Sequence, residues 1–170
     1  DMTKYFKNGT QYYATFYDAM GNPLVNETVR FNINGVIYEK RTNNKGTANL
    51  TISLYPGNYI LTAYHPNGES HGYNINVLST LIDNNNITMY YRDGTAFTIK
   101  VIDGQGKPLA NTTVRFNING VFYDKVTDEN GIAKLGIRLY PNNYIITSSY
   151  NGLEVSNNIG VSSSNTTIIG

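Results

Sequence analysis

The chain has 170 residues, a net charge of +1, no cysteine and no tryptophan. A charge so near zero gives no bulk attraction to nucleic acid or an anionic membrane. The lack of cysteine excludes disulfides and cysteine-bound metals. No stretch approaches the roughly 18 apolar residues of a membrane span, and none has a signal-peptide pattern. We therefore expect no nucleic-acid partner and no membrane insertion by this chain.

The sequence repeats with a period of 85 residues, so that residues 9–63 align without a gap with residues 94–148. The shared stretch at 23–38 and 108–123 reads Pro-Leu-x-Asn-x-Thr-Val-Arg-Phe-Asn-Ile-Asn-Gly-Val-x-Tyr. A fixed period of this kind indicates a repeated structural unit. The identities are mostly apolar and turn residues, which a scaffold needs and a unique active site does not.

We predict two tandem domains, residues 1–85 and 86–170, because about 85 residues suffice for a domain with a modest core. The Asp and Asn residues at 83–86 are the predicted linker, which is short enough to keep the domains close. The first residues of the chain align with its middle, so we expect a piece of a longer array.

Short runs of alternating apolar and polar residues follow one another in the first repeat, as in half-buried strands. Turn-forming residues such as Gly21-Asn22-Pro23 and Tyr55-Pro56-Gly57-Asn58 separate these runs. Apolar side chains that share one face are Tyr12, Ala14 and Phe16, then Val29, Phe31 and Ile33, then Ala48, Leu50, Ile52 and Leu54, then Tyr59, Leu61 and Ala63, and finally Tyr73, Ile75 and Val77.

Two turn signals recur in both repeats. Asn34-Gly35 and Asn119-Gly120 each lie between alternating runs and predict type I′ hairpins, since both central residues need a positive φ. Tyr59 and Tyr144 each open a strand after a proline-containing turn. They are expected either at a tyrosine corner, with the hydroxyl bonded back to the backbone, or as plain core tyrosines.

Each repeat thus contains about seven strands with turns every 8–12 residues, a pattern typical of a β-sandwich. No window shows a sustained helical periodicity of 3.6 residues. The predicted fold class is all-β, with two tandem sandwiches of about seven strands each.

Three motifs then carry a resemblance to known surface modules. They are Gly-x-Pro-Leu at 21–24, Thr-x-x-x-Gly-x-Ala-x-Leu at 42–50 and Tyr-Pro-x-Asn-Tyr-Ile at 55–60, each repeated 85 residues later. Together they resemble the immunoglobulin-like modules of invasin and intimin type and carboxypeptidase regulatory-like sandwiches. The string from Tyr5 through Val36 more closely resembles repeats of adhesin-like surface proteins of methanogenic archaea. This resemblance implies an extracellular, cell-surface array of immunoglobulin-like domains and brings no catalytic residues.

We therefore expect a non-enzymatic adhesin-like stalk segment, monomeric within a longer array. The alternative is a module that binds an unknown surface glycan or protein through its own loops or a sheet face. Outward aromatic and apolar residues, Tyr13, Tyr17, Ile37 and Phe122, are candidates for such a face. A third interpretation is an accessory domain of a cell-wall enzyme.

Histidines and acids offer little chemistry. His65 and His71 fall on a predicted hairpin of the first repeat, where they form either a two-histidine ligand site or two exposed loop residues. Asp18 and Asp103 share one repeat position at a turn, and Asp83 lies in the linker. Such carboxylates can cap a turn or bind a structural Ca²⁺. Turn capping is the expected role, and no cofactor is expected.

Lys4 lies on the core-facing side of the first predicted strand, where the second repeat has Met89. Surface stalk domains often join such a lysine to an Asn or Asp, so an isopeptide bond to Asp18, Glu27, Asn74 or Asn76 is one interpretation. The alternation of the last predicted strand, in which Tyr73, Ile75 and Val77 face inward, however, directs Asn74 and Asn76 outward. The other interpretation is a lysine stem lying over apolar surface with its amine in water.

Six Asn-x-Ser/Thr sequons occur, and an exported chain would expose them as N-glycosylation acceptors. Two of them occupy equivalent positions after a turn, although abundant Asn and Thr produce some sequons by chance. The acceptor residues are Asn8, Asn26, Asn49, Asn86, Asn111 and Asn165.

Overall fold

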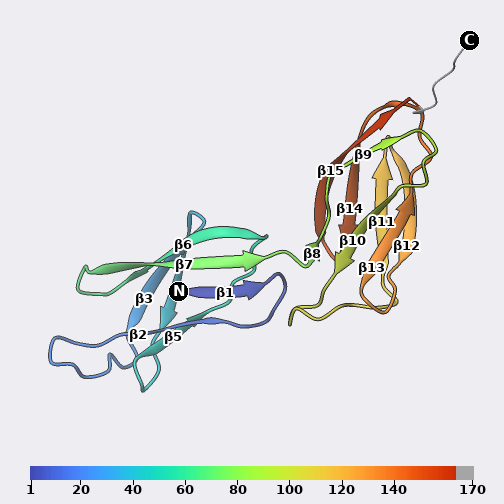
Figure 1. The fold of residues 1–170 in the computed structure, drawn as a ribbon. Helices are drawn as coiled ribbons and strands as arrows, with labels where there is room; N and C mark the ends of the chain where they lie inside the picture. Colours follow the sequence, from blue (N-terminus) through green and yellow to red (C-terminus); the bar gives the residue numbers. More distant parts are fainter. Residues whose placement is uncertain (164–170) are drawn as a thin grey trace, which may run out of the picture. The chain divides into compact units, whose positions relative to one another are not determined.

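The computed structural model describes residues 1–163, which contain strands and turns and no helix. The chain forms two compact units, the first comprising Asp1–Ser79 and the second beginning at Thr80 (Figure 1). The all-β prediction is confirmed. The second unit begins six residues before the predicted boundary between residues 85 and 86, so the residues predicted as a linker lie within it.

Unit 1 is a sandwich of two sheets. Five strands pair in the order β1-β7-β6-β3-β4, and β2 and β5 form the second sheet. The strands are β1 Met2–Tyr5, β2 Tyr12–Thr15, β3 Thr28–Ile33, β4 Val36–Arg41, β5 Thr47–Leu50, β6 Gly57–Tyr64 and β7 Ser70–Leu78.

Unit 2 repeats this arrangement with one strand more. Its large sheet has the order β12-β11-β14-β15-β9 and its smaller sheet the order β13-β10-β8. The strands are β8 Leu81–Ile82, β9 Ile87–Tyr90, β10 Ala96–Val101, β11 Thr113–Ile118, β12 Val121–Val126, β13 Ile132–Gly136, β14 Asn142–Tyr150 and β15 Leu153–Ser162.

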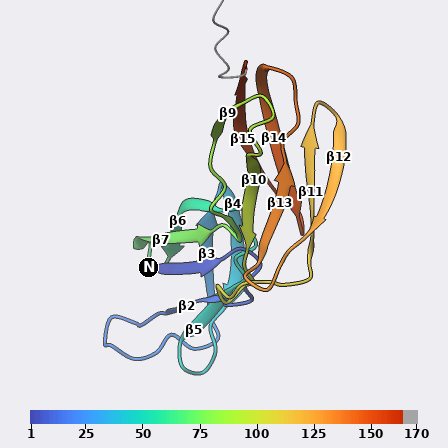
Figure 2. The ribbon, with the colours of Figure 1, turned by 45° about the vertical axis from the view of Figure 1, so that its right-hand side comes forward.

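In each unit, the strand of the five-stranded sheet that comes first in the sequence pairs in parallel with the strand that comes last in the sequence. In unit 1, β1 runs beside β7 with Met2 opposite Ile75 and Tyr5 opposite Leu78. In unit 2, β9 runs beside β15 in the same way. Figure 2 shows both pairs. All other strand pairs are antiparallel.

The core of each unit consists largely of the alternating side chains that the sequence pattern predicts. Four of the predicted inward residues of unit 1 are only half-buried, namely Ala14, Leu54, Tyr59 and Tyr73. Phe31 and Phe116 are fully buried at equivalent positions of β3 and β11. The ring of Phe116 meets Phe97 edge-on at a centroid distance of 5.8 Å, while Phe31 meets Tyr12 in the same way at 6.3 Å. Burying such rings is the main favourable term in folding, and edge-to-face contacts add to it.

The predicted turns form as expected. Asn34 and Gly35 have φ of 53° and 77°, and Asn119 and Gly120 have φ of 52° and 78°. These positive angles at both central positions fit a type I′ hairpin, which asparagine and glycine adopt at the lowest conformational cost.

Both predicted tyrosine corners are present. The hydroxyl of Tyr59 donates to the carbonyl oxygen of Tyr55, and that of Tyr144 donates to Tyr140, each at 2.7 Å. The tyrosine thereby fastens the strand to the proline-containing turn before it.

The segment 80–86, which includes the predicted linker at 83–86, is tied into unit 2 by strand pairing of its first half and by amide side chains of its second half. Leu81 and Ile82 pair with β10, and Leu81 is only 2% exposed. Asn157 of β15 accepts a hydrogen bond from Asn84 Nδ2 at 2.9 Å and donates to the Asn84 carbonyl at 3.0 Å. It also donates to Asn86 Oδ1 at 3.2 Å. Asn84 and Asn86 thus bond to β15 through their amide groups, and Asn86 does so from an exposed position.

Candidate functional site

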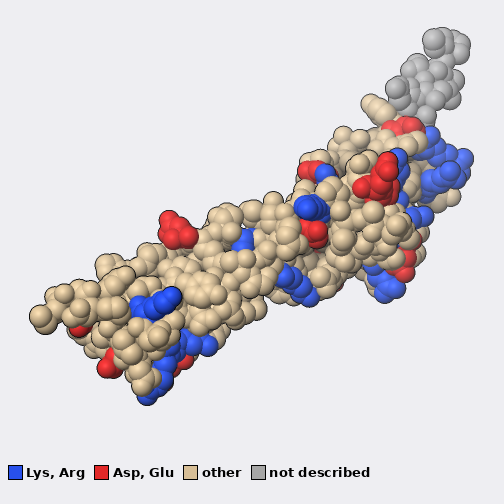
Figure 3. All heavy atoms as spheres, turned by 90° about the horizontal axis from the view of Figure 1, so that it is seen from below, with Lys and Arg blue, Asp and Glu red and all other residues tan. Residues whose placement is uncertain are grey.

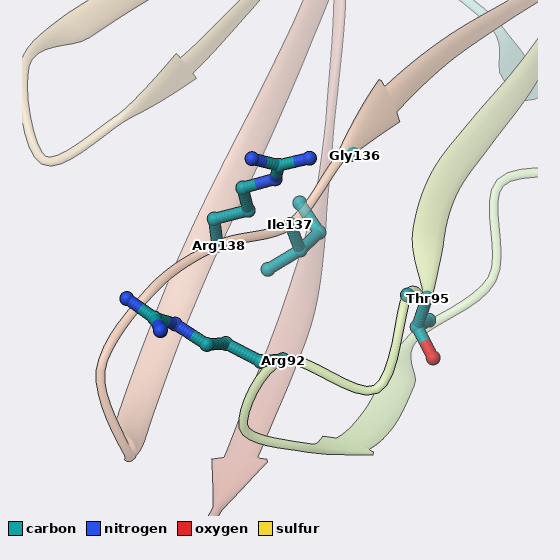
Figure 4. A pocket seen from close by; sticks show the side chains of 6 residues that line it. Arg92, Thr95, Gly136, Ile137 and Arg138 are labelled. Carbon is teal, nitrogen blue, oxygen red and sulfur yellow. The ribbon is translucent and has the colours of Figure 1, made fainter.

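A depression of about 540 Å³ on unit 2 is rimmed by two arginines, Arg92 and Arg138. Figure 4 shows Arg92 and Arg138 extending from two different loops, with the guanidinium group of Arg138 directed upward and that of Arg92 to the left, Ile137 beside Arg138 and Thr95 to the right. The remaining lining residues are Gly94 and Gly136, so none of the six is acidic.

The loop after β9 holds Arg92 in a left-handed conformation, with a φ of 59°. Next to it, Asp93 fastens the loop by accepting hydrogen bonds from the backbone amides of Thr95 and Tyr90, each at 2.9 Å. Hydrogen bonds from Thr95, followed by that from Tyr90, lower the pKa of the Asp93 carboxyl because they stabilise its charged form. Asp93 therefore stays ionised and keeps the loop closed at neutral pH.

Arg92 also rests on an aromatic stack. Its guanidinium lies 5.1 Å from the centroid of the Tyr91 ring, and Tyr91 stacks on Tyr140 at 5.6 Å. Unit 1 has the same arrangement of a cation over two stacked rings, with Lys7 over Phe6 and Phe6 stacked on Tyr55. The cation position is therefore shared by both repeats.

The second arginine is particular to unit 2. The residue equivalent to Arg138 in unit 1 is Ser53, so only unit 2 offers two guanidinium groups. Planar guanidinium groups bind carboxylate, sulfate and phosphate groups through paired hydrogen bonds. The arrangement can therefore receive an anionic group.

Unit 1 has its own depression beside the β6–β7 hairpin, with a volume of about 670 Å³. Tyr64, Pro66 and Ile37 supply apolar wall, and Arg30 stands at the edge in an exposed ion pair with Glu39 at 3.2 Å. The hairpin turns through Pro66-Asn67-Gly68, whereas β14 and β15 turn through Asn151-Gly152. The hairpin loop thus differs between the repeats.

His65 has a structural role in this hairpin. Its Nδ1 accepts from the Asn67 amide at 3.1 Å, so Nε2 carries the proton and donates to the Tyr17 carbonyl at 2.7 Å. His71 lies exposed on β7. Within residues 1–163, no group of three or more His, Cys, Asp or Glu side chains is placed to hold a metal ion.

Asp18 and Asp103 cap their turns. Asp18 Oδ1 accepts from the amides of Met20 and Asn22, and Asp103 accepts from Gln105 and Lys107, all at 2.9 Å. The hydrogen bond from Lys107 is the main cause of the lowered pKa of Asp103. The same contacts in both units explain why the repeat keeps an aspartate here.

Lys4 lies inside unit 1, as its position in the alternation predicts. The side chain is buried, and Nζ donates to the Ile52 carbonyl at 2.6 Å. Burial lowers the pKa of Lys4, because desolvation disfavours the charged form.

The predicted crosslink partners of Lys4 lie elsewhere. Asn74 is exposed and Asn76 is half-buried, on the face of β7 opposite the buried Ile75 and Val77. The carboxylate of Asp18 is engaged in its own turn. The structure therefore places Lys4 beside a backbone carbonyl and does not bring these side chains to it, and the crosslink stays a prediction.

Most predicted glycosylation acceptors lie at the surface. Asn26 and Asn111 each have a φ of 54° at the same turn position, and Asn49 and Asn86 are exposed as well. Asn8 is half-buried. Asn165 lies outside the described residues, and use of the sequons stays a prediction.

The outward residues Tyr13, Tyr17, Ile37 and Phe122 are all more than half exposed.

Sequence reasoning missed a pair of buried threonines, Thr42 and Thr127. Thr127 Oγ1 donates to the Leu109 carbonyl at 2.7 Å and accepts from the Thr112 amide at 3.0 Å. The signal for it was the threonine that opens the repeated Thr-x-x-x-Gly motif.

Residues 1–163 contain no helix that is long and apolar enough to span a membrane. The sequence matches no protein-family model and no curated protein.

Solved structures with similar folds include the fibronectin(III)-like modules of Clostridium thermocellum CbhA, at 14% identity over 99% of this chain and 94% of that one, with a TM-score of 0.38. Invasin, a bacterial integrin-binding protein, is 19% identical over 92% of this chain and 36% of its own length, with a TM-score of 0.41. The I9–I11 tandem of titin is 16% identical over 95% and 63%, with a TM-score of 0.46.

Proposed function

We propose that this chain is a non-catalytic stalk segment of an extracellular, adhesin-like cell-surface protein. Its two immunoglobulin-like sandwiches would act as mechanical spacers that carry a binding region away from the cell. The archaeal origin that the motifs imply is part of this proposal.

The observation that carries the proposal is the parallel pairing of the first and last strands in each unit. Tension on the chain pulls β1 from its N-terminal end and β7 from its C-terminal end. Because the strands run in the same direction, that tension acts along both strands and loads all their hydrogen bonds together. Unit 2 keeps the same geometry in β9 and β15. A module of this design resists extension.

The surface is compatible with exposure to an outside medium. On the face shown in Figure 3, acidic and basic side chains are interspersed among mostly neutral ones. The chain lacks cysteine, so its stability rests on the packed cores. The exposed sequons would add a polar coat if they carry glycans.

Surface location is testable with antibodies raised against the 170-residue chain. Intact cells of the source organism should bind the antibody as strongly as permeabilised cells do. Mild protease treatment of intact cells should remove the signal. Labelling that requires permeabilisation would contradict the proposal.

A second candidate function is recognition of an acidic glycan, which the two guanidinium groups of Arg92 and Arg138 favour. Both arginines line the depression, and no acid is among the lining residues. A uronate carboxylate or a sulfate could pair with either guanidinium group, since both anions accept paired hydrogen bonds.

This candidate is tested by titrating the chain with an oligogalacturonate and with a neutral cello-oligosaccharide. Binding of the acidic sugar alone, lost on replacing both Arg92 and Arg138 by Ser, would support it. Replacing Arg115, which pairs with Asp124 at 3.0 Å elsewhere on unit 2, by Ser is the matched control. Equal binding of all variants would reject this site.

A further inference from the structure

The smaller sheets of the two units differ at one edge. In unit 2, β10 has β13 on one side and β8 on the other. In unit 1 the equivalent strand, β2, pairs with β5 alone. The 85-residue period makes Phe16 equivalent to Val101, and Val101 is the residue that pairs with Leu81 of β8. Unit 1 thus has an open edge where unit 2 has a third strand.

Backbone groups along this edge are directed to receive a strand. Phe16 N–H donates to Gly46 O toward β5 at 2.8 Å, so the alternate residues Thr15 and Tyr17 turn their N–H groups to the opposite side. In unit 2 the counterpart of the Tyr17 amide, that of Ile102, donates to Thr80 O at 3.0 Å. The Tyr17 amide has no equivalent bond within residues 1–163.

A depression of about 400 Å³ follows the same edge. It runs along Tyr12 to Tyr17, and its opposite wall comes from the β6–β7 hairpin, including Ala63, His65 and Tyr73. In unit 2 the side chain that pairs at this edge is Leu81, which is buried. The depression therefore lies where an apolar side chain of an added strand would go.

The hydrogen bond of His65 to this edge is compatible with such a strand. His65 Nε2 donates a hydrogen bond to the carbonyl oxygen of Tyr17. In unit 2 the equivalent residue, Ile102, bonds to Thr80 through its amide and not through its carbonyl oxygen. A strand can therefore pair with Thr15 and the Tyr17 amide while His65 keeps its bond.

We propose that the open edge of β2 is a strand-docking site. Its occupant is an extended peptide with the chemistry of Thr80–Ile82, a hydroxyl residue followed by two branched apolar residues, joined to Asp1 through three further residues. Unit 2 fixes this geometry, because Thr80–Ile82 precede Asn86 and Asn86 is the repeat equivalent of Asp1. Strand addition to an open edge supplies backbone hydrogen bonds, and a pocket for alternate side chains supplies selectivity.

The test extends the full chain ahead of Asp1 with a copy of residues 79–85 and measures hydrogen exchange of individual amides by NMR. The amides of Thr15 and Tyr17 should exchange at least about tenfold more slowly than in the unextended chain. The amides of Lys100 and Ile102 in unit 2 should not change, so they serve as the internal reference.

The matched control carries the same extension with its leucine and isoleucine replaced by aspartate, and should leave Thr15 and Tyr17 unprotected. Equal exchange at Thr15 and Tyr17 with and without the apolar extension would overturn the proposal. A free peptide of residues 79–85 provides a further arm. If it protects these amides at micromolar concentration, the site accepts strands from other molecules and the assignment to a segment ahead of Asp1 is wrong.

Discussion

The ammonium group of Lys4 lies 2.6 Å from the carbonyl oxygen of Ile52, inside the sandwich of unit 1. Met89 occupies the equivalent position in unit 2 and is buried too. One site in the repeat therefore holds a charge in one copy and a thioether in the other. A single hydrogen bond to a carbonyl only partly offsets the loss of hydration of a buried ammonium group.

Replacing Lys4 by Met should stabilise unit 1 by about 1 kcal/mol or more, because it removes a buried charge and keeps an unbranched side chain. Thermal unfolding of the variant, followed at amides of unit 1, measures this gain. Lys45→Met, at an exposed turn position, is the control and should change little. A destabilised Lys4→Met protein would mean that the lysine makes a bond that methionine cannot replace, such as the predicted crosslink.

The stability of unit 1 should also rise with pH. Burial lowers the folded-state pKa of Lys4 below its ordinary value of 10.5, so between these two pKa values the unfolded chain binds more protons than the folded one. Stability therefore increases as pH rises through that window and levels off above it. Urea titrations across the alkaline range should show this rise, and the Lys4→Met variant should lack this contribution.

The buried hydroxyl of Thr127 should contribute substantially to the stability of unit 2. In Thr127→Val the shape is kept, but the Leu109 carbonyl and the Thr112 amide lose their partner. We expect unit 2 to lose about 1–3 kcal/mol, the cost of unpaired buried polar groups. Thr113→Val, at an exposed position of β11, should be nearly neutral. Similar denaturation midpoints for both variants would contradict this account.

Any side chain at Gly131 should destabilise unit 2 for two reasons, a steric clash with the backbone and a positive φ. A Cβ there would lie 2.5 Å from the Val101 carbonyl oxygen, and the φ is 77°. Gly120 has nearly the same φ, 78°, with open space around it. Gly120→Ala should therefore cost only the conformational strain, about 1–2 kcal/mol. Gly131→Ala should cost distinctly more, as measured by urea unfolding, and equal losses would show that the close approach has no effect.

Leu81 should stabilise unit 2 and not unit 1. Its buried side chain pairs at the edge of β10, so Leu81→Ala should cost about 2–5 kcal/mol. Amide exchange should show the loss in unit 2 while unit 1 keeps its protection. If neither unit responds, Leu81 makes no stabilising contact and the pairing of β8 with β10 does not hold unit 2 together.

The sequence predicts the parts of this fold that local physics determines. Alternation identifies buried side chains such as Phe31, Leu61 and Val77, because a strand's period of two assigns each residue to a face. The asparagine-glycine turns follow from the conformations those residues tolerate. Such rules need only a few neighbouring residues.

The remainder depends on partners far along the chain. Nothing around Asn84 and Asn86 distinguishes loop asparagines from those that bind Asn157, 73 and 71 residues away. The parallel pairing of β1 with β7 is likewise a long-range contact. The Arg92 and Arg138 rim escaped notice for the same reason, since two loops distant in sequence build it.

The central claim, that each unit bears tension through its parallel terminal strands, is tested most directly by pulling unit 1 in two directions. Because the chain has no cysteine, introduced cysteines define the points of attachment. Handles at positions 1 and 79 load β1 and β7 along their length, whereas handles at positions 1 and 74 open the same pair from one end. We expect unfolding in the first geometry at a clearly higher force and in a single step. Equal forces in both geometries would contradict the stalk function proposed for this chain.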